Sequence, residues 1–293
     1  MPAWFWLPCL AVAGVAAGDE RRHQRGQERR WGESWYFDFA AADLSIGGFV
    51  RLSLFPNLGV AWYWAALVGR GRRLVLVRDH EIELPRQAGL EVRGQGLWSA
   101  VSCETPLDHW SIGLEAFAVA LDDPLEAFRG ERGDLVCLGF DLEWEARAAA
   151  AAVGDNAVGD GHYEQSCDAY GEILFGDERL AFEGAGQRAH TWGVADWWGG
   201  SRAWAAGLLS DGTSFTSMSG ISADVGPAGL PLTAAVSIGD LSLTASPVAH
   251  APLLVEAADG RTSRLVRTLC RYRADDGREG GGWMELLQPP EHA

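Results

Sequence analysis

The stretch of residues 136–145, VCLGFDLEWE, alternates between apolar and polar side chains and decides the fold class. On an extended strand, successive side chains point to opposite faces. One face of this strand is therefore apolar and the other carries carboxylates, as in an antiparallel sheet with one buried and one wet side. The apolar face comprises Val136, Leu138, Phe140, Leu142 and Trp144, and the opposite face includes Asp141, Glu143 and Glu145.

Similar short runs, separated by Gly, Asp and Pro, fill the rest of the chain. Helices of about 10 to 15 residues between strands, which a parallel α/β sheet requires, are absent. Asp211-Gly212 lies between two apolar runs and indicates a hairpin. We therefore predict an all-β protein of antiparallel strands. The runs include FVRLSLF (49–55), VAWYWAALV (60–68), LVLVRDHEIEL (74–84), WSIGLEAFAVAL (110–121), YGEILFG (170–176), LTAAVSI (232–238) and SRLVRTLCRYRA (263–274).

The length of 293 residues favours two domains. Residues 148–161, AAAAAVGDNAVGDG, are low in complexity and lack aromatics, so we expect an interdomain linker there. The expected organisation is a leader or disordered arm over residues 1–30, a β domain over 31–147, and a second β domain over 162–290.

Charge and composition limit the possible partners. The formal net charge is -16, which repels nucleic acid and anionic membranes. No run after the N-terminus approaches a membrane span, so stable insertion is not expected. The five cysteines show no C-x-x-C pair and the seven histidines show no ligand spacing, so we expect no metal and no cofactor.

The N-terminus leaves two locations open. Residues 3–17, AWFWLPCLAVAGVAA, resemble the apolar core of a signal peptide but lack a basic region before it. An extension from a misassigned start codon fits equally well. We expect a cytoplasmic protein with reduced thiols, or a secreted one if residues 1–18 are a true signal peptide.

The segment GQRAHTWGVADWW (186–198) carries the strongest chemical signal. On a strand, Arg188, His190 and Trp192 share one face. A cation, an imidazole and an indole on one stripe could hold an apolar molecule and transfer a proton. Asp196 follows closely and could orient His190 or balance Arg188. A histidine hydrogen-bonded at a sheet corner is the alternative.

Two further groups of residues are candidates. Glu115 shares a face with Gly113, Phe117 and Val119, which would raise the pKa of its carboxyl if that face is interior. An edge strand with this face in water is the alternative. The 14 tryptophans are expected either to fill the core or to line a ligand cavity. The candidate ligand-binding tryptophans are Trp62, Trp64, Trp192, Trp197, Trp198 and Trp283.

Several motifs carry a family resemblance. WGESWYFDF (31–39), IGGFVRLSLFPNLG (46–59), GQRAHTWGVADWW (186–198) and GGGWME (280–285) together resemble an uncharacterised family of actinobacterial proteins. That family is distantly similar to carotenoid 1,2-hydratase (hydroxyneurosporene synthase) and other tandem-lipocalin proteins, some of them cyclases. The resemblance implies two lipocalin-like, calycin-type barrels and cofactor-free acid-base chemistry on an apolar polyene, terpenoid or lipid.

Three functional hypotheses follow, of which one is a purely structural or partner-binding β protein whose aromatic stripe is ordinary core. The first is a hydratase, isomerase or cyclase in which His190 is the acid or base and Arg188 and Asp196 tune it. The second is a non-catalytic carrier or sensor that binds an apolar metabolite in the same cavity. Positioned titratable groups in the cavity would favour the enzyme, since a carrier needs none.

Overall fold

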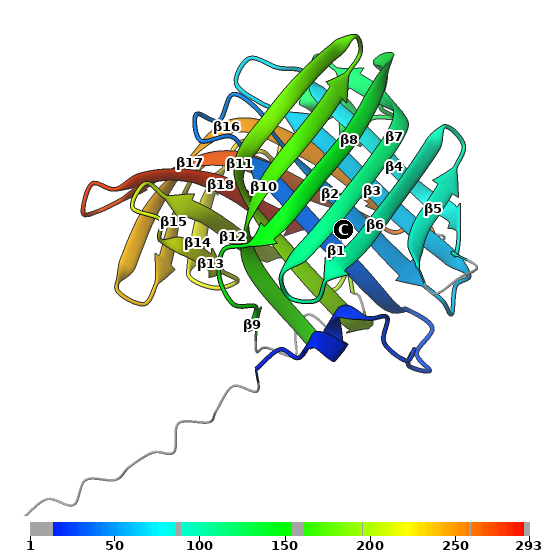
Figure 1. The fold of residues 1–293 in the computed structure, drawn as a ribbon. Coiled ribbons are helices and arrows are strands. Elements are labelled where there is room, and N and C mark those ends of the chain that lie inside the picture. Colours follow the sequence, from blue (N-terminus) through cyan, green and yellow to red (C-terminus); the bar gives the residue numbers. More distant parts are fainter. Residues whose placement is uncertain (1–13, 86–88, 154–160, 195, 258, 290–293) are drawn as a thin grey trace, which may run out of the picture.

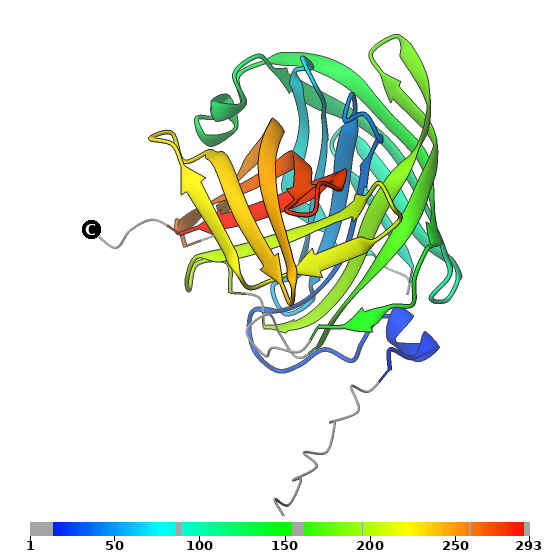
Figure 2. The same cartoon turned by 90° about the vertical axis from the view of Figure 1, so that its left-hand side faces the viewer.

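A computed structural model of the protein describes residues 14–85, 89–153, 161–194, 196–257 and 259–289. The described chain is built almost entirely of antiparallel strands, as the alternating patterns predicted. Two short 3-10 helices, η1 (Ala17–Glu20) and η2 (Pro124–Phe128), accompany them. Figure 1 shows the strands gathered into two sheets that pack side by side, and Figure 2 views the second sheet in front of the first.

The first sheet closes into a barrel. Its strand order is β4-β3-β2-β1-β11-β10-β8-β7-β6-β5, with β9 beside β10, and β4 also pairs with β7. This additional pairing closes the ring, and β5 and β6 extend the sheet beyond it. The strands are β1 (Trp31–Ala40), β2 (Gly47–Phe55), β3 (Val60–Val68), β4 (Leu74–Glu83), β5 (Leu90–Gly94), β6 (Leu97–Thr105), β7 (His109–Leu121), β8 (Asp134–Ala146), β9 (Ala151–Ala152), β10 (Gly161–Phe175) and β11 (Glu178–Val194).

The second sheet has the order β13-β12-β18-β17-β16-β15-β14 and curls around a small core of its own. The predicted turn at Asp211-Gly212 connects β12 to β13, and Gly212 has the positive φ of 86° that such a turn requires. The strands are β12 (Arg202–Leu209), β13 (Ser214–Ser217), β14 (Ile221–Val225), β15 (Pro231–Ile238), β16 (Leu241–Glu256), β17 (Thr262–Ala274) and β18 (Glu279–Gln288).

The change of sheet does not coincide with the expected linker at residues 148–161. Strands β10 and β11 follow that segment, yet they pair with β8 and β1 and complete the first barrel. Residues 154–160 lie outside the described residues, and Ala151–Ala152 form β9. Composition marked a connection between strands but could not show which strands pair across it. The organisation into two domains stays a prediction.

Three apolar cores organise the molecule. One fills the first barrel, one fills the second sheet, and the third lies between the outer wall of the barrel and the second sheet. Strand β8 keeps the predicted asymmetry, since Leu138, Phe140, Leu142 and Trp144 are buried while Asp141 is exposed. The core between the sheets buries the outward-facing side chains of the barrel wall.

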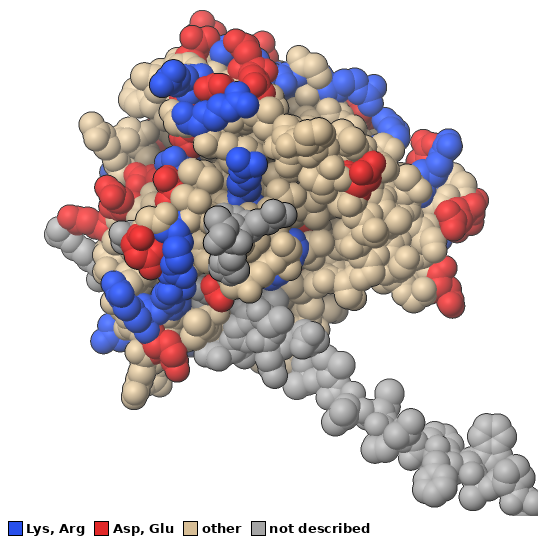
Figure 3. Space-filling view, turned by 180° about the vertical axis from the view of Figure 1, so that it is seen from behind, with Lys and Arg blue, Asp and Glu red and all other residues tan. Residues whose placement is uncertain are grey.

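The surface carries interspersed charges of both signs. Arg73 pairs with Asp122 and Asp134, at N to O distances of 2.8 and 2.9 Å. On the face drawn in Figure 3, basic side chains lie beside acidic ones near the margins of a large uncharged area. No helix in the described part of the chain has the length and apolar character needed to cross a bilayer.

The thiols in the described chain are unpaired. Cys103, Cys137, Cys167 and Cys270 are all free, whereas Cys9 lies outside the described residues together with most of the expected leader. The choice between cytoplasm and secretion stays a prediction.

Gly282 tests the close packing of β12 and β18. A Cβ atom there would clash with the backbone oxygen of Ala206, and neither strand can move away without losing hydrogen bonds of the β12–β18 pairing. Gly282→Ala should lower the free energy of unfolding by about 1–3 kcal/mol, as overpacked positions do. Denaturant unfolding measures this, with Gly200→Ala as control because a Cβ at Gly200 meets nothing within 4 Å. Equal stability of both variants would contradict the strand packing.

Candidate functional site

Strand β11 places Arg188, His190 and Trp192 on one face, as alternation predicted. The face points into the first barrel, because Trp35 and Phe37, their register partners on β1, belong to the barrel core. Arg188 and His190 are 2% and 0% exposed. The predicted stripe therefore exists, but it lies inside the barrel and away from the second sheet.

Arg188 is held by a residue from the N-terminal arm. Its guanidinium forms an ion pair with Glu20, at N to O distances of 2.6 and 3.1 Å, and its Nε donates to Oε1 of Gln165 at 2.7 Å. Glu20 is only 4% exposed. The structure thus packs Glu20 into the barrel, whereas the sequence predicted a leader or disordered arm over residues 1–30. A single acidic residue within a charged run gives no sequence signal that it will enter a core.

His190 is enclosed by polar and aromatic partners. Its Nδ1 donates to the backbone oxygen of Asp19 at 2.8 Å, its Nε2 lies 2.9 Å from Oε1 of Glu33, and its ring stacks on Trp35 with centroids 4.6 Å apart. Burial lowers the pKa of His190, against the opposing effect of Glu33. His190 lines neither of the two cavities between the sheets nor the cavity at the mouth of the first barrel.

Two predicted partners lie elsewhere. Asp196 is at the surface, with a side chain that is 55% exposed and 4.0 Å from Arg30, and Glu33 takes the position beside His190 that Asp196 was expected to fill. Glu115 is exposed on the outer face of β7, next to Phe117, which is 66% exposed. The expected apolar environment of Glu115 is therefore absent, because the interior face of β7 is the opposite one.

The tryptophans divide between core and cavity. Trp62, Trp64 and Trp283 are at most 6% exposed and pack in the core between the sheets. Trp197 lines a small cavity in the same interface, together with Trp204, which was not predicted. Trp192 stacks on His23, with centroids 3.7 Å apart, and Trp198 lies under the guanidinium of Arg261 at 4.7 Å. Of the six candidate tryptophans, only Trp197 lines one of the cavities described for this chain.

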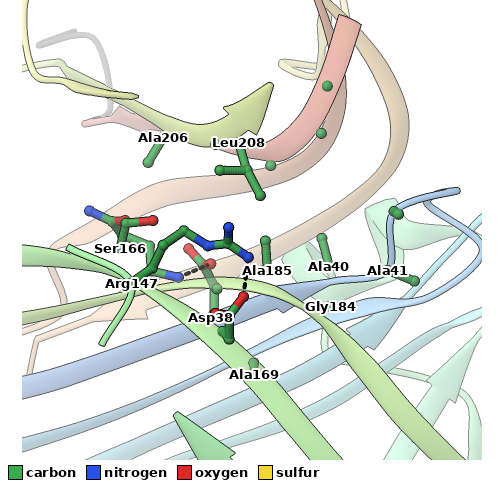
Figure 4. A pocket seen from close by; sticks show the side chains of 18 of the residues that line it. Asp38, Ala40, Ala41, Arg147, Ser166, Ala169, Gly184, Ala185, Ala206 and Leu208 are labelled. Atoms are coloured by element: carbon green, nitrogen blue, oxygen red, sulfur yellow. Dashed lines mark hydrogen bonds and ion pairs between the residues drawn. The ribbon is translucent and has the colours of Figure 1, made fainter. Parts of the chain in front are cut away.

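A large cleft opens where the two sheets meet. It has a volume of about 950 Å³ and lies between β1, β10 and β11 on one side and β12 and β18 on the other. In Figure 4, Ala40, Ala185 and Gly184 belong to the first wall, and Ala206 and Leu208 face them from the second. The walls are dominated by small residues, including Ala40, Ala41, Ala42, Gly184, Ala185, Gly186, Ala206, Gly207, Gly280, Gly281 and Gly282.

Asp38 is a buried carboxyl on the wall of this cleft. It is 4% exposed, Oδ2 accepts the hydroxyl hydrogen of Tyr36 at 2.7 Å, and Oδ1 accepts the backbone N–H of Gln187 at 2.9 Å. Burial raises the pKa of Asp38 to about 7, although hydrogen bonding to Tyr36 and the charge of Arg267 act in the opposite direction. A carboxyl of this kind can donate or accept a proton near neutral pH.

The sequence places Asp38 there through strand alternation. In WYFDF (35–39) the aromatic side chains Trp35, Phe37 and Phe39 fill the barrel, so Tyr36 and Asp38 must point outward. The second sheet then covers that outer face. The sequence did not single out Asp38 as a candidate, since nothing local shows that the polar face becomes buried.

A second, smaller cavity of about 90 Å³ adjoins Tyr36 within the interface. Arg267 forms an ion pair with Glu285, and its guanidinium carbon lies 3.8 Å from the centroid of the Tyr36 ring. Glu164 accepts from Trp204 Nε1 at 2.8 Å. Buried charges therefore surround the phenol that donates to Asp38, and they fix its orientation.

A third cavity of about 1020 Å³ lies at the mouth of the first barrel, where the arm meets β4, β5 and β6. Glu20, Trp35 and Trp110 contribute to its lining. Next to the same arm, one nitrogen each of His23 and His190 and an oxygen of Glu33 lie within 4.8 Å of one another. The expectation of no metal rested on sequence spacing, which cannot detect ligands that three separate segments bring together.

The fold and the cleft define a protein of two lipocalin-like antiparallel barrels in tandem. The chain belongs to the family described as a domain of unknown function (DUF7064), which matches residues 16–232. Among curated proteins, no sequence matches significantly.

Solved structures share the fold over most of their length. A putative AttH from Nitrosomonas europaea has 11% identity over 89% of this chain and 94% of that one, with a TM-score of 0.59. Kievitone hydratase from Nectria haematococca has 12% identity over 96% of this chain and 94% of that one, also with a TM-score of 0.59. CghA has 9% identity over 90% of each chain and a TM-score of 0.50.

Glu20→Ala tests the seating of the arm. The substitution leaves the guanidinium of Arg188 buried without its carboxylate, which costs about 3–5 kcal/mol in comparable pairs. Chemical denaturation should show a loss of this order, whereas Glu28→Ala, an exposed position on the same arm, should change stability little. If both variants are as stable as the parent protein, the arm does not enter the barrel in solution.

Asp38→Asn tests the raised pKa. Because the folded-state pKa is about 7 and the usual value is 3.8, the carboxyl favours folding fully below pH 3.8, and that contribution is lost as pH rises toward 7. An asparagine side chain does not ionise, so the variant does not lose stability in this way as pH rises. The variant should therefore be more stable than the parent above pH 7, by up to about 4 kcal/mol at about 1.4 kcal/mol per pKa unit, and the difference should shrink toward pH 4.

Urea unfolding at a series of pH values measures this difference. Asp141→Asn, at an exposed position on β8, is the control and should show a constant difference from the parent. A constant difference for Asp38→Asn as well would mean that the carboxyl is not buried as described.

Proposed function

We propose that this protein is a cofactor-independent enzyme that uses Asp38 for acid-base chemistry on a hydrophobic small molecule held in the cleft between the two barrels. The observation that carries the proposal is a buried carboxyl with a pKa of about 7 on the wall of a cleft of about 950 Å³. Groups with pKa values near the working pH are the most effective proton donors and acceptors.

The local geometry suits a proton transfer. Near neutrality Asp38 is present in both protonation states, so it can give a proton and recover it in one cycle. In a hydration, the proton of Asp38 adds to one carbon of a carbon-carbon double bond, water adds to the other carbon, and the surplus proton of that water returns to Asp38. The hydroxyl of Tyr36 and the N–H of Gln187 stabilise the carboxylate between the two steps.

An isomerase or cyclase uses the same groups. Protonation of a double bond gives a cation that can lose a different proton or be attacked by a second double bond of the same molecule. Asp38 supplies the first proton and accepts the last one in either case. The reaction class is therefore a lyase of the hydratase type or an isomerase or cyclase.

The cleft walls favour an apolar substrate. The alanine and glycine positions present methyl groups and backbone, while Arg147, Asp168, Glu183, Arg271 and Glu279 add charged groups to the lining. The volume lies within the usual range of ligand sites. A terpenoid, polyene or lipid-like molecule fits these walls. The resemblance to carotenoid 1,2-hydratase and the name of kievitone hydratase, which shares the fold, both support testing hydration first.

Asp38 replaces His190 in this proposal. Both nitrogens of His190 are engaged by Asp19 and Glu33, and its side chain faces the barrel rather than the interface cleft. A carrier is the second candidate, because small apolar walls alone would bind a hydrophobic metabolite without reaction.

Turnover of the natural ligand separates the two functions. Molecules that co-purify with the protein are identified by mass spectrometry and then incubated with it in D₂O. An enzyme incorporates deuterium at carbon, or adds one water, and Asp38→Asn should lower this rate by about 100-fold or more while binding changes little. Ser166→Ala, also in the cleft wall, is the control and should retain most of the rate.

The pH profile gives a second readout. When the protonated carboxyl starts the reaction, the rate falls as pH rises above about 7. A ligand that binds but never reacts in the parent protein would leave the carrier function in place of the enzyme.

A further inference from the structure

The cluster at the arm end of the first barrel is built from three segments. His23 comes from the arm, Glu33 from β1 and His190 from β11. Nδ1 of His23 lies 2.8 Å and Nε2 of His190 lies 2.9 Å from the same oxygen, Oε1 of Glu33. Glu33 and His190 are almost fully buried, and the His23 side chain is 21% exposed.

The hydrogen-bond partners of His190 determine which of its ring nitrogens carries the hydrogen. The backbone oxygen of Asp19 can only accept, so Nδ1 of His190 carries its hydrogen toward it. In the neutral ring, Nε2 then directs a lone pair at a carboxylate oxygen 2.9 Å away. Two acceptors that face one another at this distance need a positive charge between them.

A bound cation fits this arrangement better than a shared proton. A proton bridges two atoms, whereas here two imidazole nitrogens and one carboxylate oxygen lie within 4.8 Å of one another. Two histidines and one carboxylate form a familiar ligand set for Zn²⁺ and related divalent transition metals. Mg²⁺ and Ca²⁺ prefer sets made of oxygen alone.

Neighbouring groups orient the three side chains by hydrogen bonds and stacking, as outer-shell residues do in metal sites. The carbonyl of Asp19 sets the tautomer of His190, and the backbone N–H of His23 donates to the Glu33 carboxylate at 2.9 Å. Trp192 stacks on the ring of His23 at 3.7 Å with an interplanar angle of 11°. The partly exposed side of His23 leaves an approach for solvent and for an incoming ion.

We propose that His23, Glu33 and His190 bind one divalent transition-metal ion, with Zn²⁺ as the best fit, and that the ion clamps the N-terminal arm to the first barrel. A solvent molecule completes the tetrahedral coordination. The clamp secures the arm segment that inserts Glu20 beside Arg188. The site is separate from the cleft and does not depend on the proposed function.

Zinc binding by the full-length, untagged and metal-free protein tests the clamp. Calorimetric titration with ZnCl₂ should show one tight equivalent, and saturation should raise the melting temperature. His23→Gln and Glu33→Gln should weaken binding by more than about 100-fold, since even outer-shell changes cost 10- to 100-fold. Both should abolish the zinc-dependent rise in melting temperature.

The control is His109→Gln, which removes another His–Glu pair of the same barrel, with Nε2 2.6 Å from Glu143, and should leave zinc binding unchanged. Co²⁺ in place of Zn²⁺ should give the visible absorption of a tetrahedral site, and MgCl₂ should have no effect. Circular dichroism of each metal-free variant verifies folding, and His23→Gln is expected to fold because its side chain is partly exposed.

Asp38→Asn separates this proposal from the enzyme proposal, because it should bind zinc as the parent does. Absence of a tight equivalent in the parent overturns the clamp. Tight binding that survives both His23→Gln and Glu33→Gln overturns it equally, since the ion would then lie elsewhere, for example at the exposed Cys137.

Discussion

Strand β1 is buried on both faces, and the other features of the molecule depend on this constraint. Trp35, Phe37 and Phe39 fill the barrel, while Tyr36 and Asp38 face the second sheet. A strand with one wet face could leave a carboxylate in water at no cost. Because the second sheet covers the barrel wall, the carboxyl of Asp38 loses its hydration and must rely on Tyr36 and Gln187. The unusual protonation of Asp38 is thus a product of sheet packing.

The arm imposes a second constraint at the end of the same barrel. Arg188 is inside the barrel and needs a counter-charge, which the chain supplies from Glu20, a residue 168 positions earlier. Removing water from this pair costs free energy that the ion pair and the hydrogen bond to Gln165 must offset. The arm is therefore part of the barrel core and not an appendage.

The sequence predicted the strands and their alternation well, because the period of two is a local property. It placed Arg188, His190 and Trp192 on one face, and it anticipated the wet face of β8. It could not show that β10 and β11 join the first barrel, since pairing partners depend on the whole sheet. Asp38 was missed for the same reason, because its burial is created by the second sheet.

The N-terminal arm shows that the sequence alone does not predict which charged residues become buried. Glu20 and His23 lie in DERRHQRGQERR (19–30), where other charged residues such as Glu28 and Arg29 are exposed. Only the three-dimensional path of the chain selects the two that enter the barrel. The tryptophans show the opposite case: Trp62, Trp64 and Trp283 proved to be core, which burial of a large indole alone accounts for.

The small residues of the cleft have an evolutionary consequence. Ala40, Ala185 and Ala206 project only methyl groups into the space between the barrels, and none of them supports a side-chain hydrogen bond. Replacing any of them with a larger apolar residue would narrow the cavity at one point without opening a hole in either barrel. Ligand selectivity can therefore diverge among relatives through single substitutions, while the cores that maintain Asp38 stay unchanged.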